Sequence, residues 1–198
     1  MRPFSLSFRV AVNMSPLLVF LAIVIGVSPT AKAEKAKPCT LESLPERLQV
    51  RLKANYPSWT IQTLSNLSKT AKERWQGEKT FACPGIAVGM FKTSRLSHAV
   101  LLVPIEKPDA AYRLIIFTQG EGAAPDSFET ADQWNKGSSA NYFIRGVAIA
   151  KVFSADWVRK LRVDAKDGVM SIDAGESENG VDVYFWANGK YQHEPIDE

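Results

Sequence analysis

The sequence predicts an α+β fold in which two N-terminal helices pack on a mainly antiparallel sheet, with one disulfide. Helical periodicity is confined to residues 44–76, and strand-like apolar runs dominate after residue 85. This order lacks the regular alternation of strands and helices that a parallel sheet needs for its crossovers. The dipeptide Asn188-Gly189 between two apolar segments is a further antiparallel signal, since both residues readily take the positive φ of a type I′ turn.

Residues 1–33 have the layout of a secretory signal peptide. Arg2 and Arg9 give a basic start, Leu17–Val27 is apolar, and Ala33 ends a small-x-small cleavage pattern. The apolar run is shorter than the roughly 20 residues that a bilayer core requires. We expect cleavage after Ala33, a periplasmic or secreted location and no stable membrane span afterwards. Retention of the segment as an anchor is the alternative.

Signal removal changes the charge of the protein. The full chain carries 24 basic and 21 acidic side chains. Arg2, Arg9 and Lys32 lie in the signal peptide and no acidic residue does, so the remaining chain has 21 of each and a net charge of zero. A nucleic-acid partner would require a basic stripe, and none is visible. Residues 34–198 have the length of one ordinary domain.

Cys39 and Cys83 are the only cysteines of the chain. In an exported protein two cysteines most simply form one disulfide, here closing a loop of about 45 residues. Such a bridge stabilises the fold by about 3–4 kcal/mol on the chain-entropy estimate. A free or catalytic thiol is the alternative, and its base could come only from His98 or His193.

Two amphipathic helices are predicted between the cysteines. The first spans about residues 44–55, with a capping box between Ser43 and Glu46 and a stop at Pro57. The second spans about residues 65–76 and closes at Gly77. Their apolar stripes are Leu44, Leu48, Leu52 and Tyr56 in the first helix and Leu67, Ala71 and Trp75 in the second. We interpret both stripes as core packing, with a membrane or partner surface as the alternative.

The centre of the predicted core is Cys83–Ile105, which contains two apolar strands joined by a polar turn. The second of these, 98–103, is apolar at almost every position after the histidine, as in a strand covered on both faces. Further strands are predicted at 112–118, 141–153, 169–172, 181–187 and 190–196. The last two form the hairpin around Asn188-Gly189.

The segment 119–140 is rich in glycine, serine and polar residues, which predicts a long surface loop with one helical turn near residues 131–134. Phe128 and Trp134 are unusual in a solvated connector. We therefore consider them a possible interaction surface, because aromatic side chains often anchor binding interfaces. The alternative is that both rings fold back onto the core of the domain.

Two segments resemble a group of uncharacterised exported bacterial proteins. Cys83–Phe91, followed by an apolar strand, is similar to their Cys-Pro-Gly-x-Ala-x-Gly-Asp-Phe segment, and Tyr184–Tyr191 to their aromatic Tyr-Trp-x-x-Gly-Lys ending. With the apolar strand up to Val103 included, the segments cover less than a fifth of the chain. In that group a loop after the Phe resembles the calcium loops of FG-GAP repeats. Here the corresponding positions, Met90 and Lys92–Leu96, lack the oxygen ligands that Ca²⁺ requires, so we expect no metal there.

Catalytic and cofactor motifs are not recognisable in the sequence. His98 begins a strand, and His193 lacks the spacing of a zinc motif. Asp173, Glu176 and Glu178 could be imagined as a glycosidase pair, but a solvated acidic turn is the simpler interpretation. We therefore expect no catalytic residues, cofactor or metal.

The favoured hypothesis for function is a non-enzymatic exported domain that binds a protein or a cell-envelope component, like a periplasmic inhibitor or immunity protein. The alternative is an envelope-polymer hydrolase acting through Asp or Glu residues that the sequence does not single out.

Overall fold

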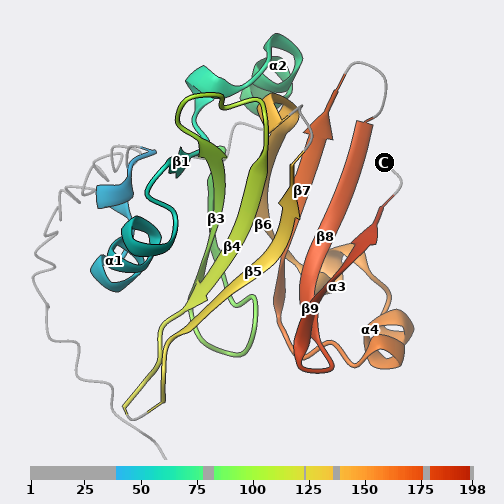
Figure 1. The fold of residues 1–198 in the computed structure, drawn as a ribbon. Coiled ribbons are helices and arrows are strands. Elements are labelled where there is room, and N and C mark those ends of the chain that lie inside the picture. Colours follow the sequence, from blue (N-terminus) through green and yellow to red (C-terminus); the bar gives the residue numbers. More distant parts are fainter. Residues whose placement is uncertain (1–38, 78–82, 123, 136–138, 176–178, 197–198) are drawn as a thin grey trace, which may run out of the picture. The chain divides into compact units, whose positions relative to one another are not determined.

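The computed structural model describes residues 39–77, 83–122, 124–135, 139–175 and 179–196, all within one compact unit, Lys35–Glu198. The predicted signal peptide lies outside the described residues. The described strands form two antiparallel sheets, and helices come first in the chain (Figure 1). The predicted α+β class is therefore confirmed, with two sheets in place of one.

Sheet A has the strand order β1-β3-β4-β5, and β2 also pairs with β3. Its strands are β1 (Trp59–Ile61), β2 (Ile86–Gly89), β3 (Ser97–Pro104), β4 (Tyr112–Thr118) and β5 (Ser127–Trp134). Sheet B has the order β6-β7-β8-β9. Its strands are β6 (Tyr142–Ala148), β7 (Asp167–Ala174), β8 (Asn179–Ala187) and β9 (Lys190–Pro195).

Strand β3 is the centre of sheet A, as predicted. Ala99, Leu101 and Val103 pack on the side that faces sheet B, whereas Val100 and Leu102 pack on the opposite side. All five side chains are buried, which confirms a strand covered on both faces. Strand β4 has the predicted bounds.

The predicted C-terminal hairpin is also confirmed. β8 and β9 are joined by Asn188 and Gly189, whose φ angles are 52° and 76°, as a type I′ turn requires. Val183 and Phe185 of β8 are buried on the outer side of sheet B. Tyr184, between them in sequence, faces sheet A.

The two sheets meet most closely along β2 and β6. Ile144 N donates to Pro84 O over 2.8 Å, and the backbone and side chain of Asp167 bond to Met90 over 3.3 and 2.8 Å. Between the sheets lies a buried apolar layer that includes Phe91 and Val169. The sheets therefore share one core, in which backbone hydrogen bonds fix the spacing on one side.

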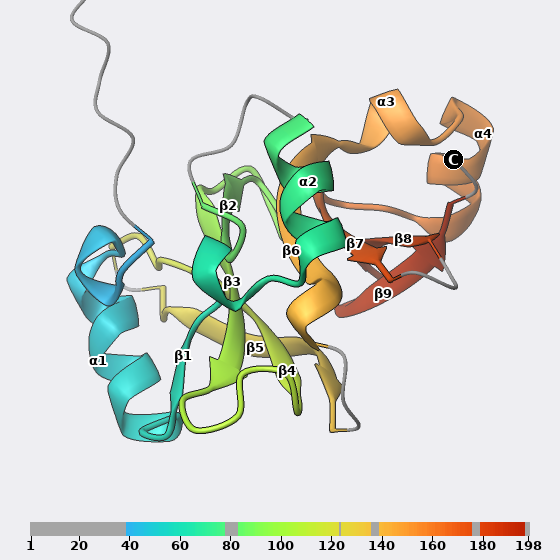
Figure 2. The ribbon, with the colours of Figure 1, turned by 90° about the horizontal axis from the view of Figure 1, so that it is seen from above.

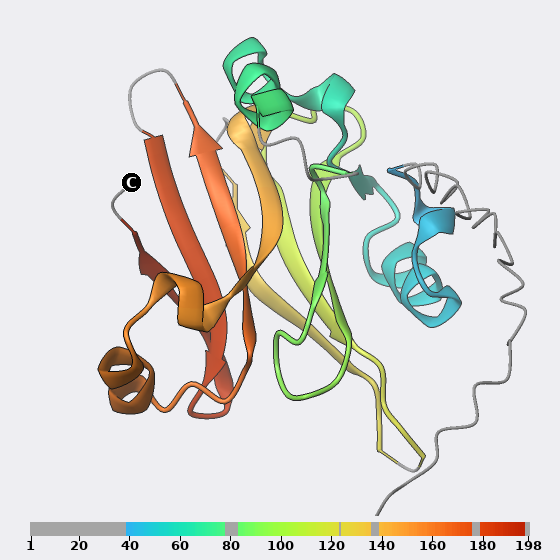
Figure 3. The ribbon, with the colours of Figure 1, turned by 180° about the vertical axis from the view of Figure 1, so that it is seen from behind.

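The helices cover the outer sides of this pair of sheets. Within the described residues they are α1 (Glu46–Asn55), α2 (Lys69–Gly77), α3 (Ile149–Val152) and α4 (Ala155–Leu161). Figure 2 shows α1 beside sheet A, and Figure 3 shows α3 and α4 in front of sheet B. Both predicted apolar stripes pack into the core: that of α1 onto sheet A and that of α2 onto sheet B.

The predicted capping box of the first helix is wrong. α1 begins at Glu46, so Pro45 holds the cap position, and its carbonyl oxygen accepts from the amides of Leu48 and Gln49. Ser43 instead belongs to a 3₁₀ turn, Leu41–Ser43, where its hydroxyl donates to Thr40 O over 2.6 Å.

The predicted loop 119–140 is also wrong over its middle, because Ser127–Trp134 is strand β5. Ile115 pairs with Thr130 while Leu114 pairs with Asp132, so Ala131 is the extra residue of a β-bulge. The bulge interrupts the two-residue alternation that would have revealed a strand. Residues of low β-propensity, such as Asp132 and Gln133, hide it further.

Two other predicted strands have different bounds. The strand expected over 141–153 ends at Ala148, and Ile149 begins the short helix α3. Ile149 is buried against sheet B, so tertiary packing outweighs the β-propensity of this apolar segment. The strand expected over 169–172 is longer, because β7 pairs with both β6 and β8 along Asp167–Ala174.

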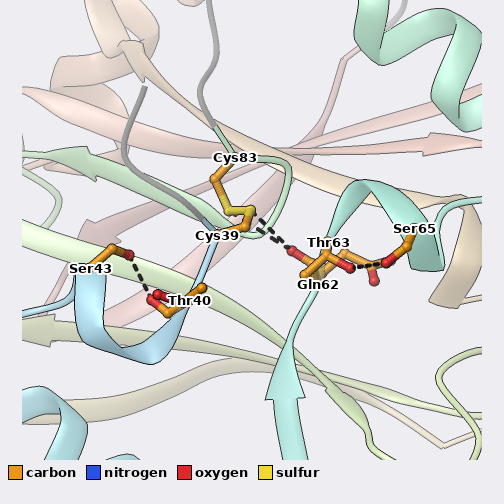
Figure 4. Close-up of a disulfide and its surroundings, with 7 residues drawn as sticks. All are labelled: Cys39, Thr40, Ser43, Gln62, Thr63, Ser65 and Cys83. Atoms are coloured by element: carbon orange, nitrogen blue, oxygen red, sulfur yellow. Dashed lines mark hydrogen bonds between the residues drawn. A yellow bond between two sulfur atoms is a disulfide. The ribbon is translucent and has the colours of Figure 1, made fainter. Parts of the chain in front are cut away.

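Cys39 and Cys83 form the predicted disulfide, with 5.2 Å between their Cα atoms (Figure 4). Both sulfur atoms lie against the backbone oxygen of Gln62, at 3.7 and 3.9 Å. Bridged sulfurs carry no proton, so these are packing contacts. The Gln62 side chain is fully buried and its Nε2 donates to Ser139 O and Tyr142 O, over 2.8 and 3.2 Å.

The disulfide should stabilise the protein mainly through the unfolded state. Replacing both Cys39 and Cys83 by Ser should lower the free energy of unfolding by about 4 kcal/mol, because the open chain regains the entropy of a long loop. Urea unfolding measures this loss, and circular dichroism should show unchanged secondary structure. Two free thiols in the mass of the non-reduced mature protein would contradict the bridge itself.

The buried amide of Gln62 should be required for stability. Gln62→Leu leaves the buried Ser139 carbonyl and the partly buried Tyr142 carbonyl without this donor, at about 1–3 kcal/mol for a buried group and less for a partly buried one. The loss of Oε1, which accepts no bond from the described residues, offsets part of this cost. We expect a net loss of about 2 kcal/mol in urea unfolding. Gln133→Leu, at an exposed position of β5, is the control and should change stability by less than about 0.5 kcal/mol.

Candidate functional site

Phe128 and Trp134 do not form a common surface. They lie six residues apart, which would place them on one face of a regular strand, but the bulge at Ala131 puts them on opposite faces. Phe128 pairs with Phe117 and packs beside Tyr56 of the α1 side, with ring centroids 6.3 Å apart. Trp134 lies at the end of β5 on the other face and is 48% exposed.

An apolar groove lies between α1 and the β1 edge of sheet A. Its volume is about 500 Å³. We call it the aromatic groove. It is lined by Leu41, Leu52, Lys53, Tyr56, Pro57, Trp59, Thr60, Leu102 and Ile105. Leu52 and Leu102 are buried and form its floor, whereas Lys53 and Ile105 are exposed at its rim.

Aromatic and cationic side chains define one end of the aromatic groove. The rings of Tyr56 and Trp59 meet edge to face, with centroids 6.3 Å apart. The Arg113 guanidinium lies over the Trp59 ring at 4.8 Å, and the Tyr56 hydroxyl lies 3.2 Å from Thr130 Oγ1. These contacts restrain both rings before any ligand arrives, which lowers the entropic cost of binding.

The groove is not evident from the sequence alone. Its walls come from the 3₁₀ turn at Leu41, the end of α1, β1 and the end of β3, which are far apart in the sequence. The only local signal is the pair Tyr56 and Trp59 on either side of the proline that ends α1. That signal shows two neighbouring rings but gives no sign of the hollow beside them.

A second cluster joins the two sheets through tyrosine hydroxyls. Tyr112 of β4 and Tyr184 of β8 both donate to Asp132 Oδ2, over 2.7 and 2.6 Å. Tyr142 packs on Tyr112, with centroids 4.8 Å apart, and bonds to Asp173. Burial, followed by the adjacent carboxylates, raises the pKa of each of these three tyrosines above its usual range.

This cluster should make the fold sensitive to alkali. The folded protein keeps Tyr112 and Tyr184 protonated above pH ~10, where the unfolded chain releases those protons. The unfolded state then binds fewer protons, so the free energy of unfolding falls as pH rises above about 10. As the pH is raised, tyrosinate absorbance should therefore appear together with the loss of circular dichroism. In Tyr184→Phe the free energy of unfolding should fall less steeply with pH. Complete tyrosine ionisation in a folded protein would contradict this.

The two histidines lie on different sheets. His98 is on β3, opposite Phe117, and lines a hollow of about 200 Å³ beside Arg95 and Glu121. His193 is on β9, stacked on Tyr184, with Nδ1 3.4 Å from Asp182 Oδ1. The Asp182–His193 pair is solvent-exposed, and the structure does not bring the two imidazoles together.

The acidic turn predicted around residues 173–178 is only partly described. Asp173 Oδ1 accepts from the amide of Gly175 over 3.0 Å, and Glu176 and Glu178 lie outside the described residues. Across the described part of the chain, no three His, Cys, Asp or Glu residues are grouped as metal ligands. In the same residues no helix is long and apolar enough to cross a membrane.

Comparisons of the chain with models of protein families, with curated proteins and with solved structures found no match. The resemblance of Cys83–Phe91 and Tyr184–Tyr191 to exported bacterial proteins therefore stays a prediction.

Proposed function

We propose that this chain is a non-enzymatic exported domain that binds an apolar segment of another cell-envelope protein in the aromatic groove. The observation that carries the proposal is the groove itself. Its volume is about 500 Å³, and eight of its nine lining side chains are uncharged. The aromatic rings at one end are restrained by their contacts. Concave apolar sites with few polar groups are the usual form of a binding site. A disulfide in the chain fits an exported protein.

The position of the groove supports a role in binding another protein. Ile105, on its rim, is 56% exposed and lines the same hollow as the half-buried rings of Tyr56 and Trp59, and apolar side chains gathered in this way are typical of a contact surface. Leu41, which forms one wall, follows Cys39 by two residues and is thus tethered by the disulfide to Cys83. A site with pre-ordered walls suits an inhibitor- or immunity-like protein, which binds without chemistry.

The hydrolase alternative gains no specific support. A glycosidase needs two carboxyl groups that flank one bond of the substrate. Asp132, a partly buried carboxylate, is already the acceptor of two tyrosine hydroxyls. Such a carboxylate links strands of two sheets, and this structural role explains its contacts.

A charge placed on the rim of the groove should weaken binding. The probe is a phage-displayed random peptide library selected on the mature protein. The enriched peptides should bind Ile105→Asp at least about tenfold more weakly, a loss of about 1.4 kcal/mol or more in binding free energy. The reason is that a carboxylate replaces an aliphatic side chain that the bound peptide would cover.

Val50→Asp is the matched control, because Val50 is 61% exposed on α1 and does not line the groove. It should bind the selected peptides as the unmodified protein does. Calorimetric titration measures both variants. Equal affinity of Ile105→Asp and the unmodified protein, or a library from which no peptide is enriched, would show that the groove does not bind a protein segment.

A further inference from the structure

We infer that the segment held in the aromatic groove is an extended strand that pairs with β1 and carries an acidic residue against Lys53. This inference rests on the proposed function and specifies the conformation and charge of the ligand. It follows from two independent features of the described residues: the edge of sheet A and the charges around the groove.

β1 is an edge strand of sheet A. It pairs with β3, and no other described strand lies on its far side. Ile105 N donates to Ser58 O over 3.0 Å and Gln62 N to Leu101 O over 2.8 Å. Residues 58, 60 and 62 therefore direct their backbone groups toward β3, so by the alternation of the ladder the Trp59 carbonyl is directed away from it.

This outward edge lies at the groove. Trp59 and Thr60 line the groove, and so does Ile105, beyond the end of β3. The Trp59 amide is already bonded to Tyr56 O over 3.1 Å, which leaves the Trp59 carbonyl as the acceptor for an incoming strand. Ile61 is buried, so pairing is confined to the Trp59 end of β1. An added strand would place every second side chain over the apolar floor.

The charge around the groove selects an acidic ligand. Lys53 is the only charged side chain among the described lining residues, and the carboxylate that interacts with it, Glu42, is exposed to solvent and does not line the groove. Arg113 lies over Trp59 and Arg51 over Phe128, with the guanidinium carbon 4.8 and 5.9 Å from the ring centroid. The cations at this end of the groove attract an acidic side chain and repel a basic one.

The test compares peptides selected by phage display on three proteins: the unmodified mature protein, Lys53→Glu and Lys72→Glu. Lys72 is a partly buried residue of α2 that lies outside the groove, so its variant controls for net charge. The unmodified protein and Lys72→Glu should enrich apolar peptides with an acidic residue. Lys53→Glu should enrich basic ones instead, and should bind the original peptides about two- to fivefold more weakly.

The strand pairing has its own readout, a scan in which each backbone amide of a selected peptide is N-methylated in turn. The Trp59 carbonyl is the acceptor that the described edge of β1 offers, so methylation should abolish binding at the peptide amide that donates to it and leave binding unchanged at the amides on either side. Tryptophan fluorescence of the complex reports binding in each case.

The outcomes separate the inference from the proposed function. If peptides bind and Ile105→Asp weakens them, but N-methylation is harmless throughout or Lys53→Glu keeps the acidic preference, the groove binds a protein segment and the strand model is wrong. If no peptide is enriched and palmitate binds in the groove, both the inference and the proposed function are wrong. Loss of binding on N-methylation of a single peptide amide, together with a reversed charge preference in Lys53→Glu, supports both.

Discussion

The contacts of Gln62 hold together the parts on which the fold depends. Its side-chain amide crosses from the end of β1 in sheet A to Ser139 and Tyr142 at the start of sheet B. Its backbone oxygen packs against the disulfide, so Cys39, the first described residue, is joined to the fold at the same place. A Cβ atom at Gly85 would lie only 2.3 Å from that oxygen, which explains why glycine occupies this position.

This arrangement connects the stability of the domain to the shape of the candidate site. Trp59 and Thr60 lie just before Gln62 in the chain, and the disulfide at the same contact tethers Leu41. Two walls of the aromatic groove, β1 and the turn at Leu41, are therefore positioned by the contacts of Gln62 and the disulfide. Leu52 and Leu102, which form the floor, belong to the buried core of α1 and β3. Both the floor and these walls are therefore in place before a ligand binds.

The fold was largely predictable from the sequence where the two-residue or helical period is regular, as in β3, β4 and the β8–β9 hairpin. It was not predictable where tertiary contacts interrupt the period. The bulge at Ala131 concealed β5, and packing against sheet B turned the apolar segment at Ile149 into a helix. The groove was unpredictable for another reason, because its walls meet only in three dimensions. Residue types at fixed spacing indicate chemistry within one element, and this site contains no such spacing.

The polar residues that conceal β5 also explain how the sheets hold together away from β2 and β6. Asp132 accepts from Tyr184, and the Lys92 ammonium lies 4.0 Å from the Trp186 ring centroid while it pairs with Glu129 of β5. Charged groups thus bridge the sheets where the apolar layer ends. These bridges use the inner face of sheet A, whereas the aromatic groove is on the outer face, against α1. A ligand can therefore occupy the groove without separating the sheets, which favours binding to a site whose form is set before the ligand arrives.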